Sequence, residues 1–386
     1  MTTTTLANAR VVLPDEVVHA SVEIDGDRII GLGAPDASGE DMAGDYLLPG
    51  LVELHTDQVE SHYQPRPRRF WDPLTAVISH DAQMAASGIT TVFDALRIGS
   101  GPGDRTVSQS AGTLIEAIVH AAEEGLLRAD HLVHLRCEVA TDDVIEAFEE
   151  VGGHDRVRLV SLMDHTPGQR QYADVSAFRT YMRGKHRFTD EEFEAHVAEL
   201  HVRAEKYSDV NRREMARRAR ERGITMAAHD DATALHVAES TDLGVRISEF
   251  PTTETAARAA RAAGQLIVMG APNIVRGGSH SGNVAAQDLL VEGLLDILSS
   301  DYVPASPLQA AFSLFGRDLV TLPQAAALVS GNPARAIGLD DRGEIAAGRR
   351  ADLVRVRAHR PIVGNLPEGA LVPIVRGVWR EGSRVA

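Results

Sequence analysis

"VELHTDQVESH", residues 52–62, places His55 and Asp57 at the end of an apolar stretch that has the residue pattern of a β-strand. Residues two apart on a strand point to the same side, so both side chains can face one way if the strand geometry continues through Asp57. Imidazole nitrogen and carboxylate oxygen bind divalent metals, although a buried strand can also end in such residues without a metal. The fold and the site therefore depend on whether further strands end in the same manner.

The middle of the chain repeats one pattern, in which an apolar, β-branched run is followed by a helix-like run. Eight such units favour a (β/α)8 barrel over an open doubly wound sheet. The glycine pattern of a dinucleotide site is absent after the first run. The expected fold class is therefore α/β, a TIM-like barrel. Its strands are predicted over 51–55, 90–95, 132–139, 157–165, 224–230, 246–250, 266–271 and 294–301, of which the last could also begin as a helix.

The two ends of the chain differ from the middle. Residues 1–47 and 339–386 consist of short strand-like runs broken by glycine. This pattern predicts one small β-sandwich domain formed by both chain termini. The barrel domain is then expected to span 48–338.

One connection of the barrel, over residues 166–223, is too long for a standard unit. It contains a capping box, Thr189 with Glu192, followed by apolar residues Phe193 and Val197 on one helical face. We expect a helical insertion that lies over the mouth of the barrel.

The bulk composition excludes several classes of protein. The chain has 386 residues and a formal net charge of −16, which argues against binding to duplex nucleic acid or to an acidic membrane. No apolar run approaches the roughly 20 residues that cross a bilayer. The start lacks the features of a signal peptide, and a single cysteine, Cys137, allows no internal disulfide. A cytoplasmic protein is expected, and a small anionic substrate remains open because a bound cation can reverse the local field.

Polar residues follow most of the predicted strands, and in a (β/α)8 barrel the C-terminal strand ends meet at the face that carries the active site. The convergence of His55, His165 and His229 predicts a divalent metal site with one or two ions, zinc being expected and manganese or iron being alternatives. The polar residues at the strand ends are His55, Asp57, Asp94, Glu138, Asp164, His165, His229 to Asp231, Glu249, Asn273 and Asp301.

The other histidines and the cysteine have simpler interpretations. Cys137 and Glu138 must face opposite ways on the third strand, so Cys137 packs outward as a small hydrophobic residue if Glu138 faces the barrel axis. Surface or packing positions are expected for His120, His131, His134, His154, His196, His201, His236 and His359.

A glycine-containing loop, "PNIVRGGSHSGN" over 272–283, follows the seventh predicted strand and precedes a helical run. Glycines let the backbone approach a ligand, a helix N-terminus attracts anions, and this quadrant of a barrel frequently binds phosphate. The alternative is a flexible connection. As an anion site, the loop would supply the substrate-binding residues Arg276, Ser279, His280 and Asn283.

Two sets of sequence segments resemble a known family, one set at the level of a superfamily and one at the level of a subfamily. The general pattern is "LLPGLVELHTD" (47–57), "AASGITTVFDA" (85–95) and the closing segment "SGNPARAIGLDDRGEIAAGRRADLVRV" (330–356), and it resembles the amidohydrolase superfamily. Within that superfamily the chain is similar to the phosphonate-metabolism hydrolases of the carbon–phosphorus lyase pathway. The blocks are "HTDQVESHYQPRPR", "HDAQMAASGITTVFDAL", "HLRCEV", "MDHTPGQRQY", "AHDDAT", "MGAPNIVRGGSHSGN" and "LSSDYVP".

This resemblance implies a function. It implies hydrolysis of α-D-ribose 1-methylphosphonate 5-triphosphate to the 5-phosphate and diphosphate, with a divalent metal. The superfamily commonly has His-x-His at its first strand, whereas this subfamily has His-x-Asp, as here in His55 and Asp57. A cyclic-amide hydrolase or a deacetylase of N-acetyl substrates is the alternative activity, and a catalytically silent scaffold is the alternative of another class. A homo-oligomer is also expected.

The same resemblance implies roles for individual residues. His55, Asp57, His165, His229 and Asp301 are implied as metal ligands, and Asp301 also as the residue that takes a proton from the attacking water. Glu138 is implied as a carboxylate ligand in place of a modified lysine, the alternative being a residue that orients a ligand histidine.

Other residues near the blocks have no such role. Lys185 and Lys206 are the only lysines and both fall in the insertion, so a carboxylated lysine is not expected. The resemblance assigns nothing firm to His80 or Asp81, and Arg66, Arg68 and Arg69 could be either ligand-binding or solvated.

Overall fold

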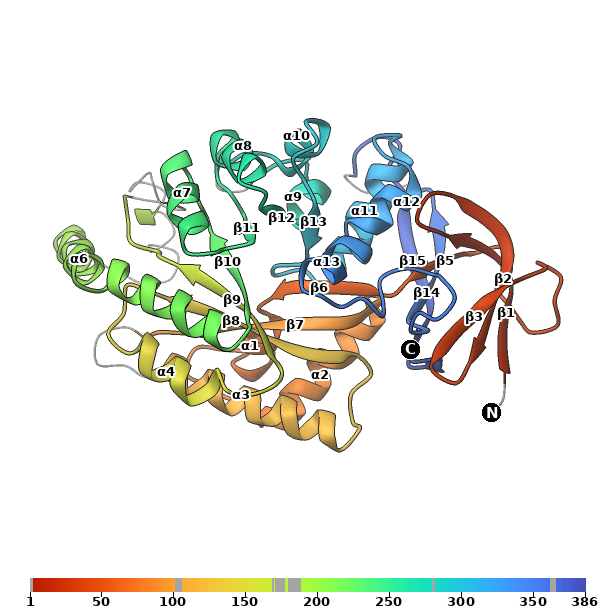
Figure 1. The fold of residues 1–386 in the computed structure, drawn as a ribbon, viewed down its shortest axis with the longest axis horizontal. Helices are drawn as coiled ribbons and strands as arrows, with labels where there is room; N and C mark the ends of the chain where they lie inside the picture. Colours follow the sequence, from red (N-terminus) through yellow and green to blue (C-terminus); the bar gives the residue numbers. More distant parts are fainter. Residues whose placement is uncertain are drawn as a thin grey trace.

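The computed structural model shows a barrel and a smaller β domain beside it (Figure 1). Helices surround the barrel strands, and the first and last segments of the chain lie together in the small domain. The structure describes residues 3–100, 106–168, 170, 178–179, 189–279, 282–361 and 366–386.

Eight parallel strands form the barrel, hydrogen-bonded in chain order from β6 to β13. A bridge between Thr56 and Asp301 joins the end of the first strand to the chain just after the last, and so closes the sheet. Each predicted run overlaps one of these strands, which confirms the expected fold class. The strands are β6 (Leu51–Thr56), β7 (Ile89–Ile98), β8 (Asp130–Glu138), β9 (Val157–Met163), β10 (Thr225–His229), β11 (Ile247–Glu249), β12 (Leu266–Gly270) and β13 (Ile297–Ser299).

Helices pack around the outside of these strands because the outward side chains of the strands are apolar. On β8, for example, Val133, Leu135 and Cys137 are fully buried in a cluster with side chains of α3 and α4. The outward packing predicted for Cys137 is therefore confirmed. The helices are α1 (Gln58–Tyr63), α2 (Pro73–Ala86), α3 (Thr106–Glu123), α4 (Val144–Val151), α6 (Asp190–Glu221), α7 (Ala234–Asp242), α8 (Glu254–Ala262), α9 (Ala271–Arg276), α10 (Ala286–Val291), α11 (Ser306–Gly316), α12 (Leu322–Ala327) and α13 (Gly331–Ala336).

The end of the barrel at which the strands begin is filled by apolar side chains. Val52, Phe93 and Leu159 from three strands form one buried cluster with Ala334 and Ile337, which belong to α13 and the residue after it. This end of the barrel is therefore closed by side chains. Ligand-binding groups have room only at the other end, where the strands finish.

The small β domain is one continuous sheet of strands from both termini, in the order β16-β15-β14-β5-β1-β2-β3, with β4 paired to β1. Side chains from its opposite ends share one buried core, so the sheet encloses that core in the manner expected of a sandwich. The strands are β1 (Thr3–Val12), β2 (Val17–Asp25), β3 (Arg28–Gly33), β4 (Glu40–Asp41), β5 (Tyr46–Pro49), β14 (Leu353–His359), β15 (Val372–Arg380) and β16 (Ser383–Arg384).

The chain passes from this domain into the barrel at Gly50, between β5 and β6. A side chain could not fit there, because a Cβ atom on Gly50 would lie 2.2 Å from Thr90 Oγ1. The crossing lies close to the border predicted at residues 47–48.

The predicted insertion contains one long helix, α6, whose N-terminus has the predicted capping box of Thr189 and Glu192. Its first turns bury Phe193 and Val197, whereas its last turns bury Met215 in the helical layer of the barrel. The insertion is thus continuous with a barrel helix. Within the described ranges, no helix is both long and apolar enough to span a membrane.

Candidate metal centre

Two of the predicted histidines, His55 on β6 and His229 on β10, are joined by one carboxylate. Glu249, at the end of β11, contacts His55 Nδ1 through Oε1 and His229 Nδ1 through Oε2, each at 2.7 Å. The two imidazole rings stack with centroids 5.6 Å apart. Because Nδ1 is engaged in both rings, Nε2 is the candidate metal ligand of each histidine.

Glu249 is held as a carboxylate in a buried position. Ser161 donates a hydrogen bond of 2.6 Å to its Oε2. Burial opposes ionisation of Glu249, but His55, His134 and His229 nevertheless hold its pKa well below the usual value. The sequence places Glu249 at a strand end, but nothing in the sequence shows that it bridges two histidines.

The third predicted histidine, His165, has its own carboxylate. Glu138 Oε2 lies 2.6 Å from His165 Nδ1, and Glu138 Oε1 accepts a hydrogen bond of 3.0 Å from the His165 backbone amide. Burial opposes ionisation, but His165 and Arg97 lower the pKa of Glu138 to about 2. His165 in turn lies beside His229, with ring centroids 5.8 Å apart. This geometry corresponds to the alternative role of Glu138, in which it orients a ligand histidine.

Asp301 and Asp57 meet where the barrel closes. The Asp301 backbone amide donates a hydrogen bond of 2.9 Å to the His55 carbonyl, and the Asp57 amide lies 3.4 Å from the Asp301 carbonyl. Asp301 adopts a left-handed conformation with φ of 53°, which is uncommon outside glycine and concentrates at functional sites. Burial and the neighbouring Asp57 charge raise the pKa of Asp301, against the effect of His55.

The condition under which His55 and Asp57 would face the same way, that strand geometry continues through Asp57, is not met. The pairing of β6 with β7 is irregular between Glu53 and Thr56, and Asp57 has φ of −96° and ψ of 15° as the residue that precedes α1. The simple alternation of side chains therefore ends before Asp57. Asp57 still lies at the barrel mouth, because its backbone amide is 3.4 Å from the Asp301 carbonyl, where the barrel closes. Its Oδ2 is 3.5 Å from Nη1 of Arg136 on β8.

Sequence reasoning gave no role to Asp230, which directly follows β10. Its Oδ2 lies 3.3 Å from His229 Nε2 and is buried without a hydrogen-bond partner in the described parts of the chain. Asp230 also has a left-handed φ of 59°. With His165 and His229 it forms a group whose possible ligand atoms all lie within 4.8 Å of one another.

Two histidines predicted at packing or surface positions, His134 and His131, are fully buried. His134 lies beneath the centre, bonded to the Leu54 carbonyl and Ser161, and burial lowers its pKa to about 3. His131, on β8, has its side chain on the outer side of the barrel, where Asp94 joins it to His80 of α2 at 2.8 and 2.7 Å. His80 and Asp81, which the sequence left without a role, therefore belong to a network between α2 and the strands.

The predicted anion loop lies near the mouth but has few described contacts. Arg276, at the end of α9, has its Nη1 3.3 Å from the hydroxyl of Tyr302, the residue after Asp301. The Asn283 amide donates to Ser279 Oγ at 3.3 Å, and His280 lies outside the described residues. Arg66, Arg68 and Arg69 are exposed.

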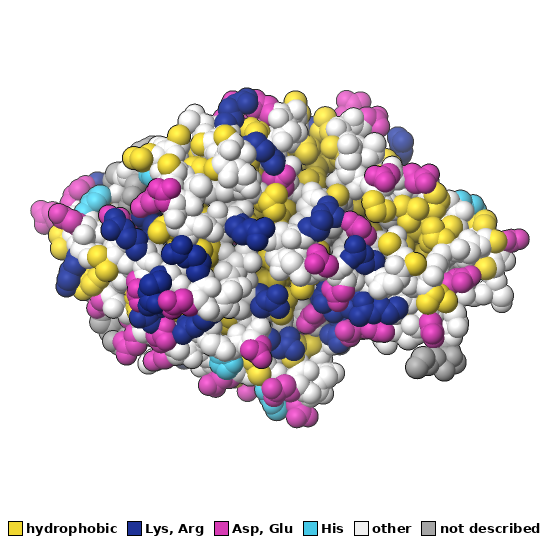
Figure 2. Space-filling view, viewed as in Figure 1, with side chains coloured by type: hydrophobic (Ala, Val, Ile, Leu, Met, Phe, Trp, Pro, Cys, Tyr) yellow, Lys and Arg dark blue, Asp and Glu magenta, His cyan; other side chains and the backbone are white. Residues whose placement is uncertain are grey.

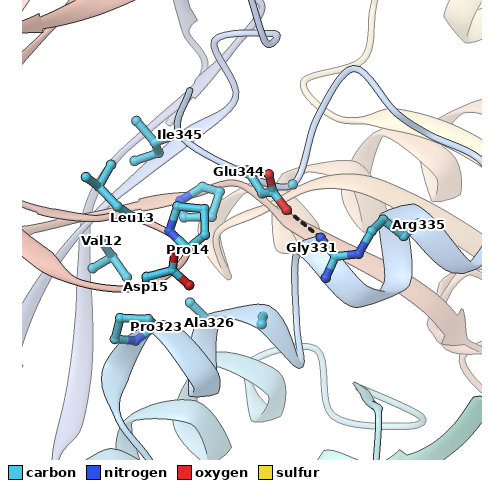
Figure 3. A pocket seen from close by; sticks show the side chains of 13 residues that line it. Val12, Leu13, Pro14, Asp15, Pro323, Ala326, Gly331, Arg335, Glu344 and Ile345 are labelled. Carbon is cyan, nitrogen blue, oxygen red and sulfur yellow. Dashed lines mark hydrogen bonds and ion pairs between the residues drawn. The ribbon is translucent and has the colours of Figure 1, made fainter. Parts of the chain in front are cut away.

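A cavity of about 280 Å³ lies between the small β domain and the barrel (Figure 3). It is lined by Val12 to Asp15, by Pro323 and by Arg335, which pairs with Glu344. Pro49, the last residue of β5 just before the first barrel strand begins, also lines it, so this cavity lies away from the strand ends that carry the histidines.

The donors at the strand ends fit a divalent metal. Three histidines have Nδ1 engaged by a carboxylate, an arrangement that is typical of metal-binding imidazoles. A buried carboxylate oxygen of Asp230 without a hydrogen-bond partner adds an oxygen donor beside His229. Such mixed nitrogen and oxygen ligands suit zinc, manganese or iron.

Comparison with known proteins agrees with this arrangement. The profile of the amidohydrolase family matches residues 58–386. A relative from Escherichia coli, α-D-ribose 1-methylphosphonate 5-triphosphate diphosphatase, is 47% identical over 98% of this chain and 99% of its own length.

Solved structures of low sequence identity share the fold. Dihydropyrimidinase from Brevibacillus agri has a TM-score of 0.63 at 16% identity, covering 99% of this chain and 95% of that one. N-isopropylammelide isopropylaminohydrolase from Burkholderia multivorans has a TM-score of 0.60 at 17% identity, covering 100% and 98%. Together, the strand-end histidines, the family profile and the full-length relative show that this chain belongs to the amidohydrolase family.

Proposed function

We propose that this protein hydrolyses α-D-ribose 1-methylphosphonate 5-triphosphate to the 5-phosphate and diphosphate, as a step of phosphonate catabolism. The observation that carries the proposal is the 47% identity to the Escherichia coli diphosphatase, which extends over nearly all of both chains. The site supports it, because the histidines and carboxylates that the reaction needs converge at the barrel mouth.

The proposed metal ligands are His55, His165 and His229 through Nε2, together with Asp57 and Asp301. When bound, a divalent metal would polarise a phosphoryl oxygen and acidify a water molecule. Glu249 and Glu138 fix the ring orientations of the histidines. We assign Glu138 this orienting role rather than direct ligation, since both of its oxygens contact His165.

Asp301 is proposed to accept the proton of the attacking water. Its backbone amide donates to the His55 carbonyl, so the closing of the barrel places Asp301 beside that proposed ligand. Arg276, Ser279, His280 and Asn283 remain proposed binding residues for the anionic substrate. One or two ions, with zinc as the first choice, a homo-oligomeric state and a cytoplasmic location also remain proposals.

The test is the reaction of the metal-loaded protein with the ribose triphosphate, followed by ³¹P NMR. We expect diphosphate to be released, and we expect no turnover of a cyclic amide such as dihydrouracil. His229→Ala should abolish the reaction and lower the bound metal, whereas His154→Ala, an exposed residue on the loop after α4, should change neither. Cleavage of the cyclic amide without diphosphate release would support the alternative activity, and failure to bind metal would support a silent scaffold.

A further inference from the structure

Two arginines at the barrel mouth, Arg97 on β7 and Arg136 on β8, have no role in the function proposed so far. They are direct partners in the parallel register of the two strands, so their backbones are roughly 4.8 Å apart. The side chains of β8 alternate, and the residues two before and two after Arg136 contact His55 and His165 respectively. Arg136 is thus on the inward side, and its ion pair with Asp57 places it at the mouth.

Arg136 is a largely buried cation, and one of its hydrogen-bond donors lacks an acceptor in the described parts of the chain. Its side chain is 16% exposed, and its shortest ionic contact is the 3.5 Å distance from Nη1 to Asp57 Oδ2. Its Nε is buried and has no hydrogen-bond partner among the residues that the structure describes. A guanidinium carries five N–H donors, and buried donors that lack acceptors destabilise the folded state. A ligand that supplies acceptors would remove that cost.

Arg97 also has a buried Nε without a hydrogen-bond partner in the described ranges, but its side chain is closer to solvent. Its side chain is 42% exposed, its Nη2 lies 3.4 Å from Glu138 Oε2, and its Nε is buried without a hydrogen-bond partner in the described ranges. Two parallel neighbours of like charge repel each other, and an anion between them would relieve that repulsion.

Three other buried arginines of this chain each donate a hydrogen bond to a carboxylate of the protein. Arg212 donates to Glu239 at 3.0 Å, Arg350 donates twice to Asp352, and Arg170 donates to Asp231. In each case a carboxylate of the protein accepts a hydrogen bond from the guanidinium. For Arg136, the ion pair found among the described residues is the 3.5 Å contact with Asp57, although its unpartnered Nε is a feature it shares with Arg170. Of these arginines, Arg136 is the one that points toward the proposed reaction centre.

We propose that Arg136 and Arg97 bind the triphosphate, with Arg136 on the phosphoryl group nearer the metal centre and Arg97 on one nearer solvent. The guanidinium fork matches pairs of phosphoryl oxygens, which a carbonyl substrate does not offer. This inference rests on the proposed function, and it adds an anion site on the second and third strands to the one expected at residues 272–283. It also gives a physical reason for a phosphate substrate in a chain with a net charge of −16.

The test compares Arg136→Gln, Arg136→Lys and Arg97→Gln with the wild type. The control is Arg213→Gln, because the Arg213 side chain is 76% exposed and its ion pair with Asp209 is 4.0 Å long. We would measure KM and kcat with the ribose triphosphate and, by calorimetry, the Kd of inorganic tripolyphosphate. Metal content and melting temperature would show whether each variant keeps its fold and its centre.

For Arg136→Gln we expect KM and the tripolyphosphate Kd to rise by about 10- to 100-fold, since charge-assisted hydrogen bonds are lost. Arg136→Lys should recover part of the loss, Arg97→Gln should show a smaller rise, and the control should match the wild type. Should Arg136→Gln not fold, the lysine variant and Arg97→Gln decide the question. An unchanged tripolyphosphate Kd in the folded variants overturns the proposal and leaves the arginines as counterions of Asp57 and Glu138.

The tripolyphosphate measurement separates this inference from the proposed function. If the wild type failed to cleave the ribose triphosphate, the proposed function would be wrong. The effect of the arginines on tripolyphosphate binding would still be measurable. If the wild type cleaves it and the arginine variants bind tripolyphosphate normally, only the arginine subsite is wrong.

Discussion

Glu249 is the residue on which the geometry of the centre depends most. Its two oxygens contact Nδ1 of His55 and of His229, which come from strands one and five of the barrel. A single carboxylate therefore sets the tautomer and the ring orientation of two proposed ligands at once. Glu138 does the same for His165 alone. At the residue scale the centre is a set of histidines that carboxylates hold in place.

The role of Glu138 can be tested by replacing it with glutamine, which preserves its shape. If Glu138 orients His165, Glu138→Gln should bind the same number of metal ions as the wild type at saturation, with an affinity lower by about 10-fold or more. Metal titration with a competing chelator measures both quantities. Glu150→Gln, an exposed change on α4, is the control. Loss of one metal equivalent at saturation would instead make Glu138 a direct ligand.

Some of these residues can be found from the sequence and others cannot. His55, His229 and Asp301 are found because each follows an apolar run, and strand ends of a barrel meet on one face. Arg136 could have been found: if Glu138 faces the axis, the residue two positions earlier faces it too. The bridging role of Glu249 could not, because it depends on the distance between side chains from β6, β10 and β11.

At the element scale, a buried charge network joins α2 to the strands β7 and β8. Asp94 contacts His131 Nδ1 at 2.8 Å and His80 Nε2 at 2.7 Å, and Asp81 lies 3.4 Å from His131 Nε2. Burial disfavours a charge on His131, but Asp94 and Asp81 raise its pKa to about 9. Arg128 donates to Asp81 at 3.0 Å and contributes a second positive charge.

This network makes stability depend on pH in a defined direction. The pKa of His131 is raised from 6.5 to about 9 on folding, so its contribution is complete below pH 6.5 and is lost as the pH rises through 9. The difference amounts to about 3 kcal/mol at most. His131→Asn should lower the free energy of unfolding at pH 6.5 by about that amount and should flatten its decline toward pH 9.

Denaturant unfolding at pH 6.5 and 9 provides the measurement, with His359→Asn, an exposed change on β14, as the control. Equal slopes of stability against pH in the wild type and His131→Asn would contradict a charged His131.

The strands were predictable from the sequence because each is a short apolar run that ends in polar residues. Two local features were not. The irregular pairing of β6 before Thr56 depends on its neighbour β7, and it ends the alternation of side chains that would place His55 and Asp57 on the same side. The continuity of α6 with a barrel helix depends on Met215 and its neighbours packing on the strands. The capping box alone shows only where the helix begins.

At the scale of the whole molecule, the barrel separates an apolar end from a polar one. Val52, Phe93 and Leu159 fill the end that α13 covers, whereas carboxylates and histidines gather where the strands finish. On the outer face shown in Figure 2, basic and acidic side chains are intermixed, and hydrophobic ones gather over the small β domain. Because carboxylates gather at the polar end, a bound cation should affect stability most at that end.

Removing the metal should consequently weaken the whole fold as well as the reaction. Asp57, Asp230, Asp301, Glu138 and Glu249 lie close together at the mouth, and their mutual repulsion falls when a cation binds among them. A metal that binds only the folded state stabilises it by about 2.7 kcal/mol when present at 100 times its Kd. After chelation we expect a barrel that keeps its far-ultraviolet circular dichroism, melts several degrees lower and has no turnover. Added zinc, manganese or iron should restore both properties.

His229→Ala serves as the internal control, since its melting temperature should respond much less to chelator or metal. If chelation removed the metal from the wild type and left both turnover and melting temperature unchanged, the strand-end histidines would not form a metal centre that the fold and the reaction use.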